Sequence, residues 1–202
     1  MIDTVVFDLG GVLIEWDPRH LYRQLLDDEE AIERFLEHVC NDAWNARHDA
    51  GRPFAEGVAE LVGRHPDQER LIRAYAERWE DMLVGEVPGT VEVLEELDAA
   101  GVRLFALTNW SRETFPVARE RYPFLARFQG VVVSGEEGIV KPDPALFRVL
   151  EDRYDVEPAR SLLVDDSATN VEAAAALGYP AERFTSAAAL RSRLVTEGVL
   201  SD

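Results

Sequence analysis

The feature of this sequence that most constrains its fold is a series of short apolar runs, rich in β-branched residues, separated by helical patterns. The clearest runs are Thr4–Phe7, Arg103–Leu107, Gly130–Val133 and Ser161–Val164, and a weaker one lies near Ala181–Phe184. Strands that are apolar throughout are typical of a sheet buried on both faces. Their alternation with helices favours parallel strands. We therefore predict an α/β protein with a doubly wound parallel sheet.

The interval between the first and second runs departs from this alternation. Residues 16–86 contain four amphipathic helical patterns and no run typical of a strand. A chain of 202 residues is long enough for one domain that carries a modest insertion. We therefore predict a core formed by residues 1–15 and 87–202, with a four-helix cap of residues 16–86 inserted after the first strand.

Charge and composition argue against several classes of partner. The net charge of −18 repels the phosphates of nucleic acids and acidic lipid surfaces, so we expect neither as a partner. No apolar stretch reaches the roughly 20 residues of a membrane-spanning helix, and no basic segment precedes the first strand as in an export signal. The single cysteine, Cys40, lies in an apolar helical pattern typical of a buried thiol. These features predict a cytoplasmic protein. We expect it to be a monomer or a homodimer.

Polar residues follow the apolar runs. In an open parallel sheet, ligands bind beyond the carboxyl ends of the strands, so we expect these residues to converge. They are Asp8, Thr108 with Asn109, Lys141, and Asp165 with Asp166. Lys141 is the only lysine among 21 basic residues, the others all being arginine. Its position favours a site that needs a compact ammonium, which a planar guanidinium does not replace.

Three carboxylates at one edge of the sheet indicate a bound cation. Like charges raise one another's pKa unless a cation neutralises them, and ligands that are all oxygen suit Mg²⁺. With the charge shielded, Asp8 can attack phosphorus and form an aspartyl-phosphate. Thr108 and Lys141, with the backbone N–H groups near Gly10-Gly11 and Asn109, are placed to hold the phosphoryl oxygens. The pattern predicts a Mg²⁺-dependent phosphatase for a small phosphorylated metabolite.

Four segments of the chain resemble the four motifs of the haloacid dehalogenase-like hydrolases, in the same order. They are Phe7–Leu13, Leu107–Asn109, Lys141–Pro142 and Val164–Asn170. The helical insertion resembles that family's α-helical cap, and the resemblance spans essentially the whole chain. It implies a Rossmann-like core.

The resemblance also implies roles for individual residues. Asp8 is the expected nucleophile, and Thr108 and Lys141 are expected to stabilise the phosphate and the intermediate. The expected metal ligands are Asp8, the backbone carbonyl of Gly10 and Asp166, with Asp165 close by or acting through water.

One position departs from the family pattern. Phosphatases of the family usually carry a second aspartate two residues after the nucleophile, which protonates the leaving group and then activates water. Here that position is Gly10, which keeps the backbone carbonyl but has no side chain to transfer a proton. General acid–base catalysis is typically worth about 10²–10⁴-fold in rate, so this difference bears directly on mechanism.

Three interpretations follow from Gly10. The first is a phosphatase that protonates its leaving group in another way, or that acts on a sugar 1-phosphate; the glycine version resembles a subgroup of sugar-phosphate phosphatases. The second is a 2-haloacid dehalogenase, which needs neither an acid nor a metal, but the Asp165-Asp166 pair would repel its carboxylate substrate. The third is a non-catalytic binding module, which leaves the joint presence of Asp8, Thr108 and Lys141 unexplained. A response-regulator receiver would have a different motif order and no cap.

The segment Asn41–Pro53 is predicted to be a loop between two cap helices, and it resembles the family's specificity loop. We expect Trp44, Arg47 and His48 to face the substrate there. His48, or an ordered water molecule, is the expected replacement for the acid missing at Gly10.

Overall fold

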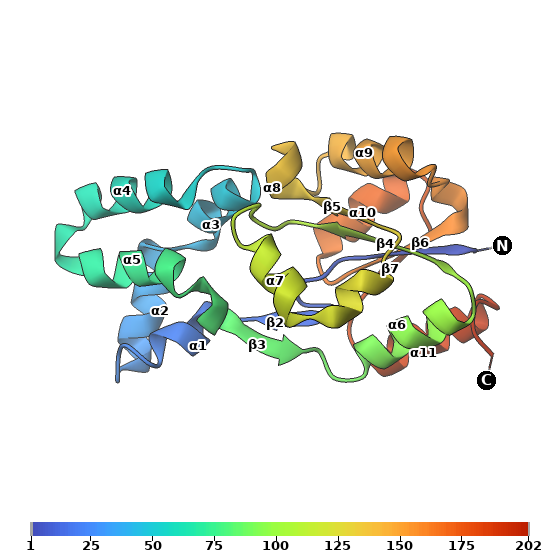
Figure 1. Ribbon diagram of the computed structural model, residues 1–202, viewed down its shortest axis with the longest axis horizontal. Helices are drawn as coiled ribbons and strands as arrows, with labels where there is room; N and C mark the ends of the chain where they lie inside the picture. Colours follow the sequence, from blue (N-terminus) through green and yellow to red (C-terminus); the bar gives the residue numbers. More distant parts are fainter. Residues whose placement is uncertain (1, 202) are drawn as a thin grey trace.

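The computed structural model describes residues 2–201, and its centre is a parallel five-stranded sheet with the strand order β5-β4-β1-β6-β7 (Figure 1). All four neighbouring pairs within this sheet are parallel. The strands are β1 (Thr4–Phe7), β4 (Arg103–Thr108), β5 (Gly130–Val133), β6 (Ser161–Asp165) and β7 (Ala181–Arg183). The predicted α/β fold with a parallel sheet is confirmed, including the weaker fifth strand. None of the helices within residues 2–201 is long and apolar enough to span a membrane.

Both faces of the sheet are covered by helices, as the apolar strands predict. Successive residues of β1 point to opposite faces: Val5 and Phe7 belong to one hydrophobic cluster, and Val6 belongs to the other. The first cluster includes side chains of α6 (Thr90–Ala99), α7 (Phe115–Arg121) and α11 (Ala187–Thr196). The second includes side chains of α9 (Pro144–Tyr154) and α10 (Ala168–Ala176). Figure 1 shows α9 and α10 on one side of the strands, and α6 and α11 on the other.

Residues between β1 and β4 form a helical lobe on a short β-ribbon. Strands β2 (Ile14–Trp16) and β3 (Leu83–Glu86) pair antiparallel and form the two ends of this segment. We call residues 18–82, between the two strands, the insert. Its helices are α1 (Pro18–Tyr22), α2 (Glu29–His38), α3 (Asp42–Asp49), α4 (Phe54–Arg64) and α5 (Glu69–Glu77). The remaining short elements are η1 (Pro66–Gln68), η2 (Trp79–Met82), η3 (Pro123–Arg127), η4 (Pro158–Arg160) and α8 (Ser134–Glu137).

Two predictions about residues 16–86 are wrong. This segment has five α-helices rather than four, because α3 occupies most of the segment predicted to be a loop. Helix α3 lacks the broad apolar stripe by which helices are recognised, since its only buried residues are Trp44 and His48. Residues 16–86 also contain strand structure, and β3 was missed because it is short and largely exposed, with Val84 39% accessible.

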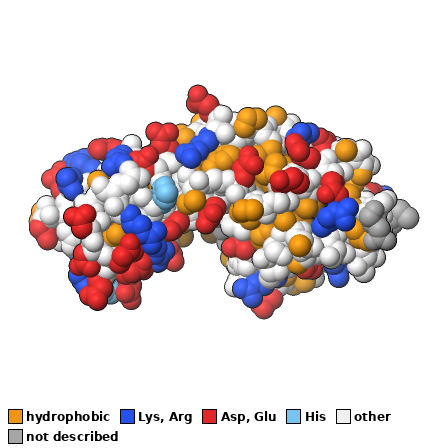
Figure 2. Space-filling model, turned by 90° about the horizontal axis from the view of Figure 1, so that it is seen from below, with side chains coloured by type: hydrophobic (Ala, Val, Ile, Leu, Met, Phe, Trp, Pro, Cys, Tyr) orange, Lys and Arg blue, Asp and Glu red, His pale blue; other side chains and the backbone are white. Residues whose placement is uncertain are grey.

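The C-terminal end of α3 is fastened to the core. The Ser134 hydroxyl donates a hydrogen bond of 2.6 Å to the backbone carbonyl of Asp49. Gly51, with φ of +92°, approaches so closely that a Cβ atom there would lie 3.0 Å from the Gly135 carbonyl oxygen. The N–H of Phe54 donates to the Glu113 carboxylate at 3.3 Å. These contacts join the two lobes at one place, whereas Figure 2 shows a broad recess between them elsewhere on the face in view.

Candidate active site

The register of the sheet brings the predicted acids to one edge. Phe7 of β1 lies opposite Ala106 of β4 and Val164 of β6. Asp8 follows β1 directly, and Asp165 is the last residue of β6. Both residues therefore lie at the carboxyl edge of the sheet, where open parallel sheets bind ligands.

Lys141 lies between two of these acids. Its ammonium Nζ is 2.9 Å from Asp8 Oδ2 and 2.6 Å from Asp165 Oδ2, and the residue is buried. Burial alone would lower the pKa of Lys141, but the two carboxylates outweigh it, so the net shift is upward and the ammonium stays charged. Asn109 fixes the lysine backbone: its Oδ1 accepts from the Lys141 N–H at 2.8 Å, and its Nδ2 donates to the Lys141 carbonyl at 3.0 Å.

Three carboxylates form a group that fits a divalent cation. Oxygen atoms of Asp8, Asp165 and Asp166 lie within 4.8 Å of one another. Burial raises the pKa of Asp8, with Lys141 opposing the shift and Asp165 adding to it. Burial and the charge of Asp165 likewise raise the pKa of Asp166. A cation would offset this repulsion, and an all-oxygen set with an exposed member suits Mg²⁺. The metal ligands predicted from the sequence include these three acids.

The two neighbouring acids have different surroundings. Asp165 is held by Lys141, by the Ser167 N–H at 2.9 Å, and by the Asn170 amide at 3.0 and 3.1 Å to its two oxygens. Asp166 is the most exposed of the three acids. It packs against Gly11, where φ is +73° and a Cβ atom would lie only 2.6 Å from Asp166 Oδ2. Asp166 therefore has the freer carboxylate for a metal, whereas Asp165 orients Lys141.

Two further features of this edge are an unpaired hydroxyl that suits a phosphoryl oxygen and a hydrogen bond that orients Asp8. Thr108 is fully buried at the end of β4, and its hydroxyl has no hydrogen-bond partner within residues 2–201. An unpaired buried hydroxyl is costly, and a phosphoryl oxygen would satisfy it. The N–H of Leu9 donates to Asp8 Oδ1 at 2.7 Å, which fixes the orientation of that carboxylate.

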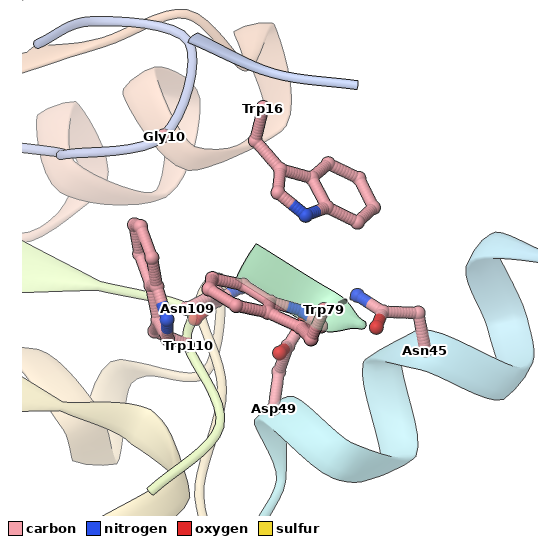
Figure 3. A pocket seen from close by; sticks show the side chains of 7 residues that line it. All are labelled: Gly10, Trp16, Asn45, Asp49, Trp79, Asn109 and Trp110. Carbon is pink, nitrogen blue, oxygen red and sulfur yellow. Dashed lines mark hydrogen bonds between the residues drawn. The ribbon is translucent and has the colours of Figure 1, made fainter. Parts of the chain in front are cut away.

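A cavity of about 190 Å³ lies between the sheet edge and the insert. Figure 3 shows that residues from both lobes line it, with Asn45 and Asp49 on the same side of α3. The lining residues are Gly10, Trp16, Asn45, Asp49, Trp79, Asn109 and Trp110. The indole N–H groups of Trp16 and Trp110 have no hydrogen-bond partner in the described part of the chain. The cavity is thus lined by three indole side chains and by the polar side chains of Asn45, Asp49 and Asn109.

The structure places Trp44 and His48 away from this cavity, in the core of the insert. Trp44 donates from Nε1 to the Gly57 carbonyl at 3.3 Å. The His48 ring is fully buried and stacks on Phe54 with ring centroids 4.1 Å apart. Its Nδ1 lies 2.9 Å from the Arg52 carbonyl, and burial lowers its pKa. The expectation that Trp44 and His48 face the substrate is therefore wrong, and His48 does not replace the missing acid.

Arg47 does not line the cavity either. It is exposed and forms an ion pair with Glu60 at 3.6 Å. These errors arose because the segment is a helix, in which residues four apart lie on the same face. In α3, Trp44 and His48 form the inward face, so Asn45 and Asp49 turn toward the cavity. Sequence reasoning missed this pair because it treated the segment as a loop.

The geometry of the acids and Lys141 indicates the class of enzyme. A fixed carboxylate beside a buried ammonium and two further acids, at the carboxyl edge of a parallel sheet, is suited to catalysis through a covalent bond to that carboxylate. The family model for haloacid dehalogenase-like hydrolases matches residues 2–178. The chain belongs to this family of hydrolases, as its sequence motifs predict.

Relatives and solved structures agree with this assignment. A phosphoglycolate phosphatase of Rhodospirillum rubrum is 31% identical over 191 residues, which cover 89% of this chain and 78% of the relative. A phosphorylated carbohydrates phosphatase of Thermotoga maritima is 25% identical over 180 residues, covering 88% and 82%. A family enzyme of Bacteroides thetaiotaomicron, solved with magnesium and inorganic phosphate, superposes with a TM-score of 0.70 at 20% identity, covering 92% of this chain and 95% of the other.

Proposed function

We propose that this protein is a Mg²⁺-dependent phosphatase that hydrolyses a small sugar phosphate through an aspartyl-phosphate on Asp8. The observation that carries the proposal is the contact of Lys141 with both Asp8 and Asp165, beside the exposed carboxylate of Asp166. The relatives named as phosphatases support it, as does the similar fold solved with magnesium and phosphate.

Each residue at the sheet edge has a separate role in the proposed reaction. The Asp8 carboxylate attacks phosphorus, the bond from phosphorus to the leaving oxygen breaks, and water then hydrolyses the acyl phosphate and regenerates Asp8. Lys141 and the Thr108 hydroxyl hold the phosphoryl oxygens as negative charge develops. Asp8, Asp166 and the backbone carbonyl of Gly10 would hold Mg²⁺, which would supply positive charge between the nucleophile and the anionic substrate.

The cavity supports a small polyhydroxylated leaving group. Its volume of about 190 Å³ is below the roughly 300–1,000 Å³ of pockets for drug-sized ligands. The indole faces of Trp16, Trp79 and Trp110 suit the apolar face of a sugar ring, and Asn45, Asp49 and Asn109 are polar groups that suit its hydroxyls. Residues 16–86 then act as a cap that contributes Trp16, Asn45, Asp49 and Trp79 to substrate selection.

The competing proposal is a 2-haloacid dehalogenase, which uses an aspartyl ester on the same carboxylate. The acidic pair Asp165-Asp166 does not favour it, because a carboxylate substrate would face two further negative charges unless a metal were bound.

One experiment separates the two activities. Phosphate release from hexose phosphates and p-nitrophenyl phosphate, and halide release from 2-chloropropionate, are measured with Mg²⁺ and with EDTA. We expect phosphate release that requires the metal and is abolished in Asp8→Asn. Halide release that persists in EDTA would instead establish the dehalogenase, and a folded protein with neither activity would indicate a binding role.

A further inference from the structure

The proposed reaction needs a proton donor that the sheet edge does not provide. When the bond from phosphorus to the leaving oxygen breaks, an alkoxide is released unless an acid protonates it. Gly10, which borders the cavity, has no side chain, and Lys141 is paired with two carboxylates. Both oxygens of Asp165 accept hydrogen bonds from Asn170, and His48 is buried in the insert. None of these four residues offers a proton to the leaving oxygen, so a side chain that could do so lies in the rest of the cavity wall.

Asp49 is the carboxyl group that lines the cavity. It is the last residue of α3, and Figure 3 shows its side chain directed from the helix end toward the cavity. The Asn45 amide, one turn earlier, donates to Asp49 Oδ2 at 3.1 Å. The Ser134 hydroxyl holds the Asp49 carbonyl at 2.6 Å, so the core itself fixes this end of the helix. Asp49 is thus an oriented group rather than a mobile surface acid.

The surroundings of Asp49 favour its protonated form. Burial is the main cause that raises its pKa to about 7, and the negative charge of Asp8 adds to the shift. The Ser111 N–H acts in the opposite direction by stabilising the carboxylate. A group that titrates near neutral pH is suited both to giving up a proton and to taking one back.

We propose that Asp49 is the general acid and base of this enzyme, supplied by the insert instead of by the segment that follows the nucleophile. This inference rests on the proposed phosphatase function. In the first step the Asp49 carboxyl gives its proton to the leaving oxygen as the bond from phosphorus to that oxygen breaks. In the second step the Asp49 carboxylate takes a proton from the water that attacks the aspartyl-phosphate, which releases phosphate and restores both aspartates.

A pair of substrates with similar shape and different leaving groups tests this role. Phenolate needs a proton on departure much more than p-nitrophenolate does. We expect Asp49→Asn to slow the first turnover of phenyl phosphate by about 10²-fold, at the lower end of the usual range for a general acid. With p-nitrophenyl phosphate, rapid mixing should still show a burst of one p-nitrophenol per active site at the wild-type rate. Slow turnover should follow, because the amide introduced by this substitution would not activate water.

Matched variants separate this role from a structural one. Asp42→Asn makes the same change of charge at an exposed position of the same helix and should leave both substrates unaffected. Gly10→Asp, added to Asp49→Asn, should restore part of the phenyl phosphate rate. A Cβ atom at Gly10 meets nothing within 4 Å, and both positions border the cavity.

The outcomes are distinct. If Asp49→Asn slows the first turnover of both substrates equally, Asp49 has only a structural role and the inference is wrong. If the wild-type protein releases no phosphate from either substrate, the proposed function itself fails, and the inference fails with it. A lost burst in Asp8→Asn together with a retained burst in Asp49→Asn supports both.

Discussion

At the scale of single residues, the site depends on a balance of buried charges. One ammonium is shared by Asp8 and Asp165, and Asp166 lies within reach of the same space. Removing one member of a buried ion pair leaves the others uncompensated, which costs more than the pair contributes when intact. Lys141 therefore stabilises the folded state as well as the proposed reaction.

Lys141→Met should show both effects. Without the ammonium, Asp8 and Asp165 repel each other, and unfolding should become easier by about 3–5 kcal/mol. Without Lys141 to oppose it, the pKa of Asp8 rises further in the folded state, so folded protein binds more protons than unfolded protein, and stability falls as the pH rises. Urea denaturation at pH 5 and pH 8 should show the larger loss at pH 8. An equal loss at both values would contradict this charge balance.

The raised pKa that suits Asp49 to its proposed catalytic role also reduces the stability of the folded protein. The pKa of Asp49 is about 7 when folded and returns to an ordinary value near 3.8 on unfolding. Between these values the folded state holds the proton more tightly, so this group reduces stability as the pH rises from about 4 to 7. We expect the melting temperature of Asp49→Asn, relative to wild type, to increase over that interval and then level off. A difference that does not vary with pH would show that Asp49 titrates normally.

At the scale of elements, helix α3 shows what the sequence could and could not predict. The strands were predictable because they are apolar throughout, and the residues after them could be placed by parallel topology alone. Helix α3 was missed because it buries an indole and an imidazole among polar residues, so it has no apolar periodicity. Because of that error, Trp44 and His48 were predicted to face the substrate, and Asn45 and Asp49 were not recognised as residues that line the cavity.

Two glycines of α4 provide a test of the packing beneath α3. A Cβ atom at Gly57 would lie 2.3 Å from His48 Cε1 and 3.2 Å from Trp44, whereas one at Gly63 meets nothing within 4 Å. Gly57→Ala should destabilise the protein by about 1–3 kcal/mol through overpacking. Gly63→Ala should stabilise it by up to about 0.5–1 kcal/mol, because alanine is the better helix former. Thermal melting compares the two, and equal effects would place His48 elsewhere.

At the scale of the whole molecule, the metal should couple the site to global stability. A ligand that binds only the folded state stabilises it by about 2.7 kcal/mol at 100 times its dissociation constant. We expect Mg²⁺ to raise the melting temperature of the wild type and to have much less effect on Asp166→Asn. Asp152→Asn, an exposed control in α9, should respond like the wild type. Equal responses in all three would place the metal away from Asp166.

The two-stranded ribbon has a consequence for how such enzymes diversify. Ile14 and Glu86 lie side by side in β2 and β3, so the chain leaves and re-enters the sheet domain through neighbouring positions. A lobe attached in this way can be replaced by a different inserted segment, since the replacement leaves the strand order of the sheet and the nucleophile unchanged. With Asp49 on that lobe, an exchange would transfer the proton donor together with the specificity pocket. Substrate range and proton transfer would then be inherited as one module, while the phosphoryl-binding edge stays constant.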